Sequence, residues 1–250
     1  MKQNKILISC CVHGDELVGK AIFENYPNGE TGWWAYKSFL ANPRAIELNT
    51  RFLNTDLNRS FPGDKNSPNY EERRATEILK HFCDYNTILD IHQTTAKMEN
   101  VAFVRTRTDM TDKILKCVKN IKIIIEDMQD GGFGGAKSTI TDYFNNAVCL
   151  EYSKKSNLKE EYLEAQVDIE NILQNNVQNN KLEYFYISST ISKEIIKLAK
   201  IELTNMLPLT SKQKQILELD LEQDYMPIFI GEQAYKDTYC HLITALNYDI

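Results

Sequence analysis

Short apolar runs alternate with helix-like segments over roughly the first 155 residues of the chain. The first run is Lys5–Cys11, and Glu71–Tyr85 has the apolar spacing of an amphipathic helix. Further runs of the kind that forms buried strands are Trp33–Leu40, Thr87–Ile91, Val101–Val104, Ile121–Ile125 and Ala147–Leu150. Buried strands that alternate with helices predict an α/β fold, with a mixed, mainly parallel sheet flanked by helices.

The pattern changes in the last third of the chain. Residues 157–180 predict a long polar helix that ends in an Asn/Gln-rich stretch, which favours a domain boundary there. After it, the strand-like runs are shorter, at Glu183–Ser188 and Tyr225–Ile230. We therefore predict a catalytic domain over residues 1–178 and a small β-rich capping domain over residues 179–250.

Composition and charge narrow the classes of partner. The chain of 250 residues has a formal net charge of −6, with acidic and basic residues mixed along its length. Without a basic stripe, nucleic acid and anionic membranes are poor partners, and a small molecule is expected instead. No apolar stretch approaches the roughly 20 residues of a membrane span. Six scattered cysteines without a CxxC pair fit a reducing compartment, so we expect a cytoplasmic protein.

Candidate metal ligands follow two of the predicted strands. His13 and Glu16 are three residues apart where a helix begins, so one cation can accept both side chains. His92 ends another strand, and ligands collect at the carboxyl ends of parallel strands. Asp90 lies two residues earlier, on the same side of that strand, and is expected to orient the His92 ring. A His-x-x-Glu pair is common by chance, but two histidines and one carboxylate predict one catalytic zinc ion per chain.

An arginine-rich segment at Asn42–Phe61 adds a second chemical signal. It holds three arginines and the tetrad Asp56-Leu57-Asn58-Arg59. Guanidinium groups bind carboxylates in a bidentate manner. Alone, the segment is consistent with a structural ion-pair network, which is the commoner use of clustered Arg and Asp. Beside a metal site, it indicates a clamp for a substrate carboxylate.

The motifs closely resemble those of the aspartoacylase/succinylglutamate desuccinylase family, a branch of the zinc carboxypeptidase-like fold. The matching motifs, in order, are His13–Glu16, Asn42–Ala45, Asp56–Arg59, Asp90–Thr95, Cys149–Tyr152 and Tyr225–Tyr235. Their order and spacing cover nearly the whole chain. The resemblance implies a hydrolase that cleaves the acyl-amide bond of an N-acyl amino acid.

The same resemblance implies a role for each matched side chain. Zinc would be bound by the two histidines and the glutamate named above. Glu151 would act as general base and then as general acid, and Arg51 would polarise the scissile carbonyl. Asn58, Arg59 and Tyr235 would bind the α-carboxylate of the amino-acid portion.

The sequence departs from the family pattern at one position. Aspartoacylases proper carry a further arginine shortly before the catalytic glutamate, which binds the aspartate side chain, and Thr141 occupies that place here. Lys137 is a candidate source of the missing charge, although ammonium and guanidinium are not equivalent at a bidentate site. The acyl group and the amino acid therefore stay open, as does homo-oligomer formation.

Two alternative functions follow from the same residues. Gly131–Ser138 nearly matches a phosphate-binding loop and would make the chain a nucleotide-binding protein, but Ala136 stands where that loop needs glycine. A glycine-rich lid over the zinc site also explains this segment. The second alternative is a metallocarboxypeptidase that removes the last residue of a short peptide, since the same clamp would bind its carboxylate.

Overall fold

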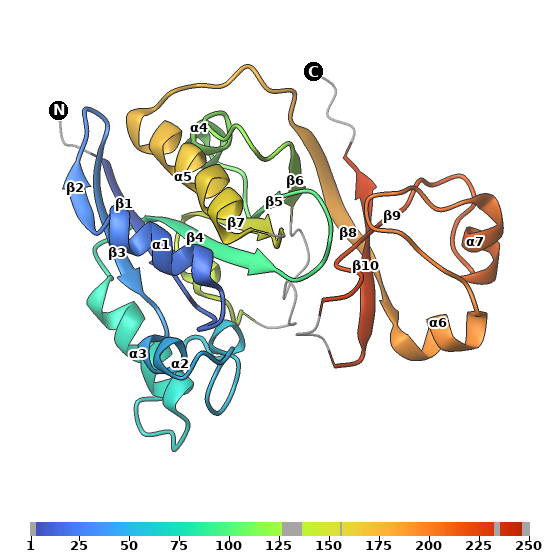
Figure 1. Ribbon diagram of the computed structural model, residues 1–250, viewed down its shortest axis with the longest axis horizontal. Coiled ribbons are helices and arrows are strands. Elements are labelled where there is room, and N and C mark those ends of the chain that lie inside the picture. The colour runs from blue at the N-terminus through green and yellow to red at the C-terminus, as the bar shows by residue number, and fades with distance from the viewer. Residues whose placement is uncertain (1–3, 127–136, 156, 233–235, 247–250) are drawn as a thin grey trace.

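A mixed β-sheet forms the centre of the computed structural model, which describes residues 4–126, 137–155, 157–232 and 236–246. The described residues build ten strands in the order β2-β3-β1-β4-β7-β5-β6-β8-β10-β9 (Figure 1). The strands are β1 (Asn4–Cys10), β2 (Asn28–Glu30), β3 (Trp34–Leu40), β4 (Thr87–Thr94), β5 (Val101–Val104), β6 (Ile123–Glu126), β7 (Asn146–Ser153), β8 (Glu183–Ser192), β9 (Met226–Ile228) and β10 (Thr238–Ala245). The helices are α1 (Leu17–Asn25), α2 (Pro43–Glu47), α3 (Tyr70–His81), α4 (Asp109–Leu115), α5 (Leu158–Gln174), α6 (Lys193–Ala199) and α7 (Ser211–Ile216), with short 3-10 helices η1 (Leu57–Arg59) and η3 (Ile140–Tyr143).

Most strand pairs of the central sheet are parallel. β1 pairs in parallel with β3 and β4, β4 with β7, and β6 with β5 and β8. β5 runs antiparallel to β7, as do the edge strand β2 to β3 and the last two strands to their neighbours. All eight residues of β4 are buried, as expected for a central strand covered on both faces. The predicted α/β class with a mainly parallel sheet is confirmed.

The two faces of the sheet carry different side chains because successive residues of a strand point in opposite directions. Leu89 and Ile91 of β4 pack in the core cluster that α1, α4 and α5 cover. Ile88 belongs to the opposite cluster, beneath α3 and η3. Figure 1 shows α1 and α5 in front of the sheet and α3 at its lower edge. Asp90 and His92 share the Ile88 face, so the alternation aims both away from α1 and α5.

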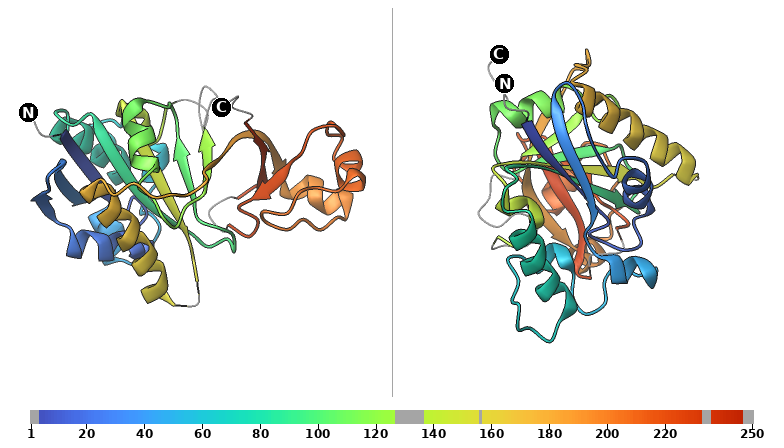
Figure 2. Two further views of the ribbon diagram at one scale, coloured as in Figure 1. Left: turned by 90° about the horizontal axis from the view of Figure 1, so that it is seen from above. Right: turned by 90° about the vertical axis from the view of Figure 1, so that its left-hand side faces the viewer.

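The last strands lengthen the sheet beyond β6. β8 pairs with β6, and β10 then pairs with β8 and β9. These strands and the short helices α6 and α7 lie at the opposite end of the sheet from β2 (Figure 2). This part of the chain is rich in β-structure, as predicted, and it packs around its own buried cluster. The division at residue 178 stays a prediction.

α3 is shorter than its sequence pattern suggested, because it ends at His81 rather than near residue 85. α5 ends at Gln174, where Asn175 adopts a left-handed conformation with φ of 54° and closes the helix. Among the described residues, no helix combines the length and apolar character needed to cross a bilayer.

Candidate metal centre and substrate cavity

His13 and Glu16 lie in the tight loop that joins β1 to α1. The loop packs directly on α2, since a Cβ atom on Gly14 would lie 2.2 Å from the carbonyl carbon of Ala45. The backbone N–H of Gly14 also donates to the carbonyl oxygen of Arg51 at 3.1 Å. Glycine at this position therefore lets the loop sit against the arginine-rich segment.

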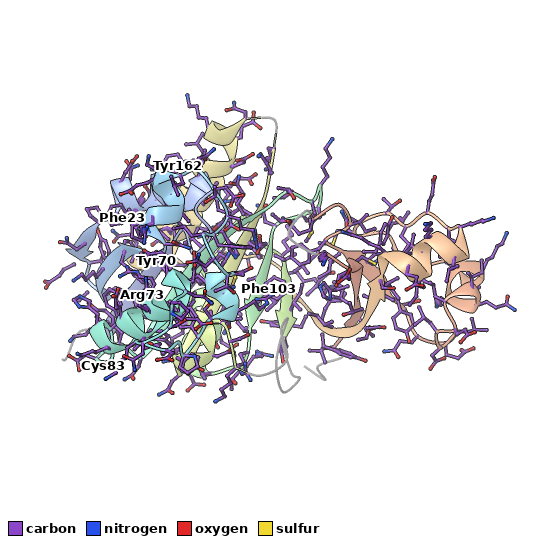
Figure 3. The ribbon with its side chains drawn as sticks, turned by 90° about the horizontal axis from the view of Figure 1, so that it is seen from below. Phe23, Tyr70, Arg73, Cys83, Phe103 and Tyr162 are labelled. Atoms are coloured by element: carbon purple, nitrogen blue, oxygen red, sulfur yellow. The ribbon has the colours of Figure 1, made fainter. Side chains whose placement is uncertain are left out.

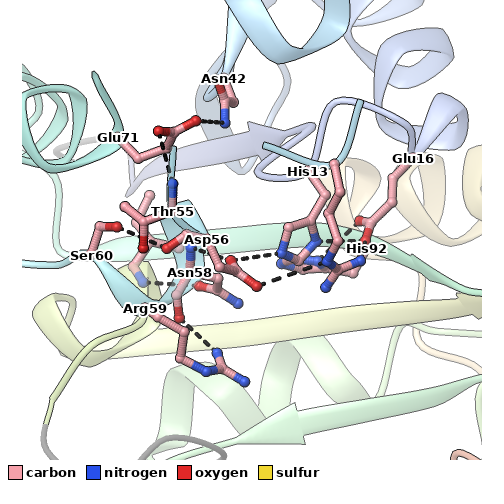
Figure 4. Close-up of polar contacts among 12 residues, drawn as sticks. His13, Glu16, Asn42, Thr55, Asp56, Asn58, Arg59, Ser60, Glu71 and His92 are labelled. Carbon is pink, nitrogen blue, oxygen red and sulfur yellow. Dashed lines mark hydrogen bonds and ion pairs between the residues drawn. The ribbon is translucent and has the colours of Figure 1, made fainter. Parts of the chain in front are cut away.

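Three predicted ligands converge at the carboxyl ends of β1 and β4. Nδ1 of His13 lies 2.6 Å from Oε1 of Glu16, and Nδ1 of His92 lies 3.0 Å from the second oxygen, Oε2. The two imidazole centroids are 5.0 Å apart. The ligand atoms of the three side chains all lie within 4.8 Å of one another, and all three side chains are buried (Figure 4).

Each imidazole has a second carboxylate on its other nitrogen. Nε2 of His13 contacts Oδ1 of Asp56 at 3.0 Å, and Nε2 of His92 contacts Oδ2 of Asp90 at 2.8 Å. A proton held on Nε2 by these carboxylates leaves the Nδ1 lone pair directed at the common point. Carboxylates behind ligating imidazoles are typical of metal sites. The arrangement therefore fits a divalent metal, and Asp56 is a partner that sequence reasoning had not assigned.

The charges of this cluster are strongly coupled. Burial lowers the pKa of both imidazoles, but the surrounding carboxylates outweigh it, so the pKa of His13 and of His92 is raised. Burial raises the pKa of Glu16, yet the two imidazoles bring it well below its usual range. A carboxylate held between two proton-binding nitrogens is a site where a divalent cation can replace the protons.

Glu151 lies beside the predicted ligands on the neighbouring strand. Glu151 on β7 pairs in register with His92 on β4, which puts both side chains on the same face of the sheet. Loss of solvent raises the pKa of Glu151 to about 8, with His92 opposing and the negative charges of Glu16 and Glu232 adding to the increase. A carboxyl group that titrates near neutral pH can both take up and return a proton.

The predicted carboxylate clamp borders the same centre. The Nη1 atom of Arg51 donates to Oε1 of Glu16 at 3.3 Å, which fixes the guanidinium beside the metal ligands. The Oδ1 atom of Asn58 accepts the backbone N–H of Ile140 at 3.4 Å, and its amide nitrogen has no hydrogen-bond partner among the described residues, so it is left to donate to a ligand. The guanidinium of Arg59 donates to the carbonyl oxygen of Asn58 at 2.7 Å and faces the cavity.

A buried carboxylate on α3 holds the loop that carries this clamp. Glu71 accepts the backbone N–H groups of Leu53 at 2.7 Å, Asn54 at 3.1 Å and Thr55 at 3.4 Å. It also accepts from the side chain of Asn42 at 3.4 Å, as Figure 4 shows. The amphipathic pattern of α3 determines which face of the helix is buried. Because Glu71 lies on the buried side, it holds the loop and thereby fixes the position of the clamp.

Most of the predicted site residues surround one cavity of about 100 Å³. Its lining includes His13, Glu16, Arg51, Asn58, Arg59, His92 and Glu151. Further lining residues that sequence reasoning had not assigned are Phe103, Arg105, Asp142, Cys149, Phe229 and Glu232. Phe103, labelled in Figure 3, stacks against Phe229 with centroids 6.0 Å apart. Strand alternation alone could have placed Cys149 on the Glu151 face, whereas Phe103 joins that face only through its pairing with Cys149 across β5 and β7.

Of the remaining predicted site residues, Tyr235 lies outside the described residues, as do residues 131–136 of the glycine-rich segment. Lys137 is exposed and is not among the described residues that line the cavity, whereas Arg105 is. The carboxylate of Glu232, three residues before Tyr235, accepts hydrogen bonds from the hydroxyl of Thr94 at 2.6 Å and from the backbone N–H of Thr95 at 3.0 Å. The carboxyl-terminal segment is therefore fastened to the strand that carries His92.

Comparisons with known proteins identify the family. The model of the succinylglutamate desuccinylase/aspartoacylase catalytic domain matches residues 2–174. This chain belongs to that family. The family membership predicted from the motifs is confirmed, and the match covers the strands and loops that carry the three candidate metal ligands and Glu151.

Relatives within the family are distant. The aspartoacylase of Danio rerio is 33% identical over 114 residues, which cover 39% of this chain and 36% of that protein. The N-acyl-aromatic-L-amino acid amidohydrolase (carboxylate-forming) of Xenopus laevis is 30% identical over 110 residues, 38% of this chain and 36% of that protein. The aligned segment thus spans little more than a third of either relative.

Solved structures from the family share the fold over almost the whole chain. Murine aminoacylase 3 gives a TM-score of 0.69 at 16% identity, over 98% of this chain and 97% of that one. The succinylglutamate desuccinylase from Chromobacterium violaceum gives a TM-score of 0.68 at 18% identity, over 99% of this chain and 86% of that one. The similarity extends through the carboxyl-terminal strands, beyond the end of the matched catalytic domain.

Proposed function

We propose that this family member is a zinc-dependent hydrolase that cleaves the acyl-amide bond of an N-acyl amino acid. The observation that carries the proposal is the convergence of His13, Glu16 and His92 beside a carboxyl group with a pKa of about 8 and an arginine-lined cavity. The names of the zebrafish and frog relatives support the class of bond.

The proposed metal ligands are His13 and His92 through Nδ1, and Glu16 through its carboxylate. Zinc, when bound, supplies an activated water with a pKa of roughly 7 and polarises the scissile carbonyl. Asp56 and Asp90 hold the two imidazoles in the tautomer that such binding requires.

Proton transfer is assigned to Glu151. It takes a proton from the attacking water and returns it to the leaving nitrogen, and a pKa near neutrality serves both steps. Arg51 stabilises the negative charge that develops on the carbonyl oxygen, a contact typically worth about 3–4 kcal/mol. Both groups line the cavity, so they contact the same substrate.

Substrate orientation is assigned to the clamp. Asn58 and Arg59 bind the α-carboxylate through an amide nitrogen and a guanidinium group. Tyr235, which lies outside the described residues, is proposed to complete the clamp. The fixed carboxylate then holds the amide bond over the ligands, which lowers the barrier by orientation.

The proposal is tested with purified protein, metal analysis and a panel of N-acyl amino acids. His13→Ala and His92→Ala should lose both bound zinc and turnover, whereas Glu151→Gln should keep zinc and lose roughly a thousandfold or more in rate. His81→Ala is the matched control, because His81 is exposed and does not line the cavity. Retention of zinc by either ligand variant contradicts the ligand set, and a near wild-type rate for Glu151→Gln contradicts the proton transfer.

Short peptides in the same panel test removal of a carboxyl-terminal residue, which the clamp would serve equally well. Cleavage of peptides with little turnover of N-acyl amino acids would favour the metallocarboxypeptidase alternative.

A further inference from the structure

The cavity extends along the sheet away from the metal ligands. On β7, Glu151, Cys149 and Ala147 occupy alternate positions on one face, and Phe103 pairs with Cys149 from β5. Arg105 directly follows β5, next to the Val104–Val148 pair, which lies about 10 Å along the strands from the Glu151 row at roughly 3.3 Å per residue. Arg105 and Ala147 both line the cavity, so its far end lies beside Arg105.

An ion pair closes this far end. The Nη1 atom of Arg105 donates to Oδ1 of Asp142 in η3. The other carboxylate oxygen accepts the backbone N–H groups of Ser138 at 2.8 Å and Thr139 at 2.9 Å. Asp142 is only 6% exposed, against 22% for Arg105. Within the described residues, Asp142 is the only hydrogen-bond partner of the Arg105 guanidinium, which keeps donor groups for a ligand.

Two hydroxyl groups lie beside the ion pair. Oγ1 of Thr139 and Oγ1 of Thr141 are 2.9 Å apart, and both residues line the cavity. A hydroxyl both donates and accepts. The far end therefore offers donors and acceptors together with one positive and one negative charge, so its net charge is close to zero.

The ion pair lies next to the proposed carboxylate clamp. The backbone N–H of Ile140, inside η3, donates to the side chain of Asn58. In an α-amino acid the side chain and the carboxylate branch from the same carbon atom. The side chain of a substrate held by Asn58 and Arg59 can therefore reach Arg105 and Asp142, which line the same cavity.

We propose that Arg105, Asp142, Thr139 and Thr141 form the side-chain subsite, and that they select an N-acyl amino acid with a neutral hydrogen-bonding side chain, a carboxamide above all. This inference rests on the proposed hydrolysis of N-acyl amino acids. A carboxamide oxygen accepts from Arg105 while its NH₂ group donates to a threonine hydroxyl. A substrate carboxylate meets the charge of Asp142, and an apolar side chain displaces water from Arg105 without replacing its hydrogen bonds.

The first test compares substrates on the wild-type protein. We expect kcat/KM for N-acetylasparagine or N-acetylglutamine to exceed that for N-acetylaspartate, N-acetylglutamate and N-acetylleucine by about tenfold or more, since hydrogen bonds to charged groups discriminate on that scale. Free asparagine should likewise inhibit more strongly than free aspartate. A preference for acidic or apolar substrates overturns the inference.

Variants then test the assigned residues through ratios of kcat/KM between substrates, because a merely structural defect lowers kcat/KM for all substrates alike. Asp142→Asn keeps an oxygen for the two backbone N–H groups but removes the negative charge, so the aspartate-to-asparagine ratio should rise about tenfold. Arg105→Gln should lower the asparagine-to-leucine ratio by a similar factor. Arg107→Gln is the matched control, because Arg107 is bound to Asp112 through two contacts of 2.9 and 3.0 Å and does not line the cavity.

The outcomes separate this inference from the proposed function. If the kcat/KM ratios of both variants stay within twofold of those of Arg107→Gln, the subsite is overturned, even if N-acyl amino acids are hydrolysed. Failure to hydrolyse any N-acyl amino acid by the zinc-loaded wild type overturns both the function and the subsite. If a variant does not fold, the wild-type substrate preference and the product inhibition still decide.

Discussion

The buried carboxylate of Glu71 offers a sharp test of how the fold positions the site, because Glu71→Gln keeps the shape of the side chain and removes one acceptor. The remaining oxygen can keep Leu53 and Asn42, so the N–H groups of Asn54 and Thr55 would face an amide NH₂ group. A hydrogen bond to a charged acceptor contributes about 1.5–3 kcal/mol, and the longer of the two lost bonds contributes less. We expect the free energy of unfolding to fall by about 2–4 kcal/mol.

That loss is measurable by thermal and urea unfolding of the purified protein. For a chain of this size it corresponds to a decrease in Tm of about 4–16 °C. The displaced loop carries the clamp, so KM should rise more than kcat falls. Glu77→Gln is the control on the same helix, because its carboxylate is exposed and contacts Arg74 alone among the described residues. Equal stability and equal KM in the two variants would refute the proposed support of the clamp loop.

Three further outcomes are expected. Asp90→Asn should weaken zinc binding by about 10–100-fold in a chelator competition, since it leaves the His92 ligand in place but loosens its orientation; unchanged affinity would remove Asp90 from the site. Gly14→Ala should abolish zinc binding or folding because its Cβ would lie 2.2 Å from a backbone atom of α2, whereas Gly32→Ala, with open space around it, should unfold at the wild-type temperature. Burial, followed by the charge of Arg59, lowers the pKa of His241 to about 4, so the unfolded state binds the proton more tightly. The contribution of His241 to the free energy of unfolding should therefore decrease by about 2 kcal/mol from pH 7 to pH 5. His241→Asn should remove that part of the decrease, and identical pH profiles for variant and wild type would contradict it.

The amino-acid sequence by itself determined the family of this protein and the local geometry of its candidate site. The three-residue spacing of His13 and Glu16 places them on one loop, and the two-residue spacing of Asp90 and His92 places them on one face of a strand. Both placements depend only on the spacing of residues along the backbone, so they do not depend on which other segments pack around them. The same period predicted the buried strands and the amphipathic face of α3.

Some elements were invisible in the sequence for a physical reason. α6 has only seven residues and α7 only six, which is too short for helical spacing to be told apart from other patterns in the sequence. These helices lie at one end of the sheet and were not predicted.

Only the tertiary structure decided which distant segments meet. The period of a strand specifies a face, but the neighbour on that face depends on strand order and register, which are set by packing of the whole sheet. The contact of Gln93 with Glu16 thus joins positions 77 residues apart, and that of Thr94 with Glu232 joins positions 138 residues apart. The pairing of Arg105 with Asp142, which determines the charge at the far end of the cavity, was likewise hidden in the sequence, because it requires β5 and η3 to face each other across the same space.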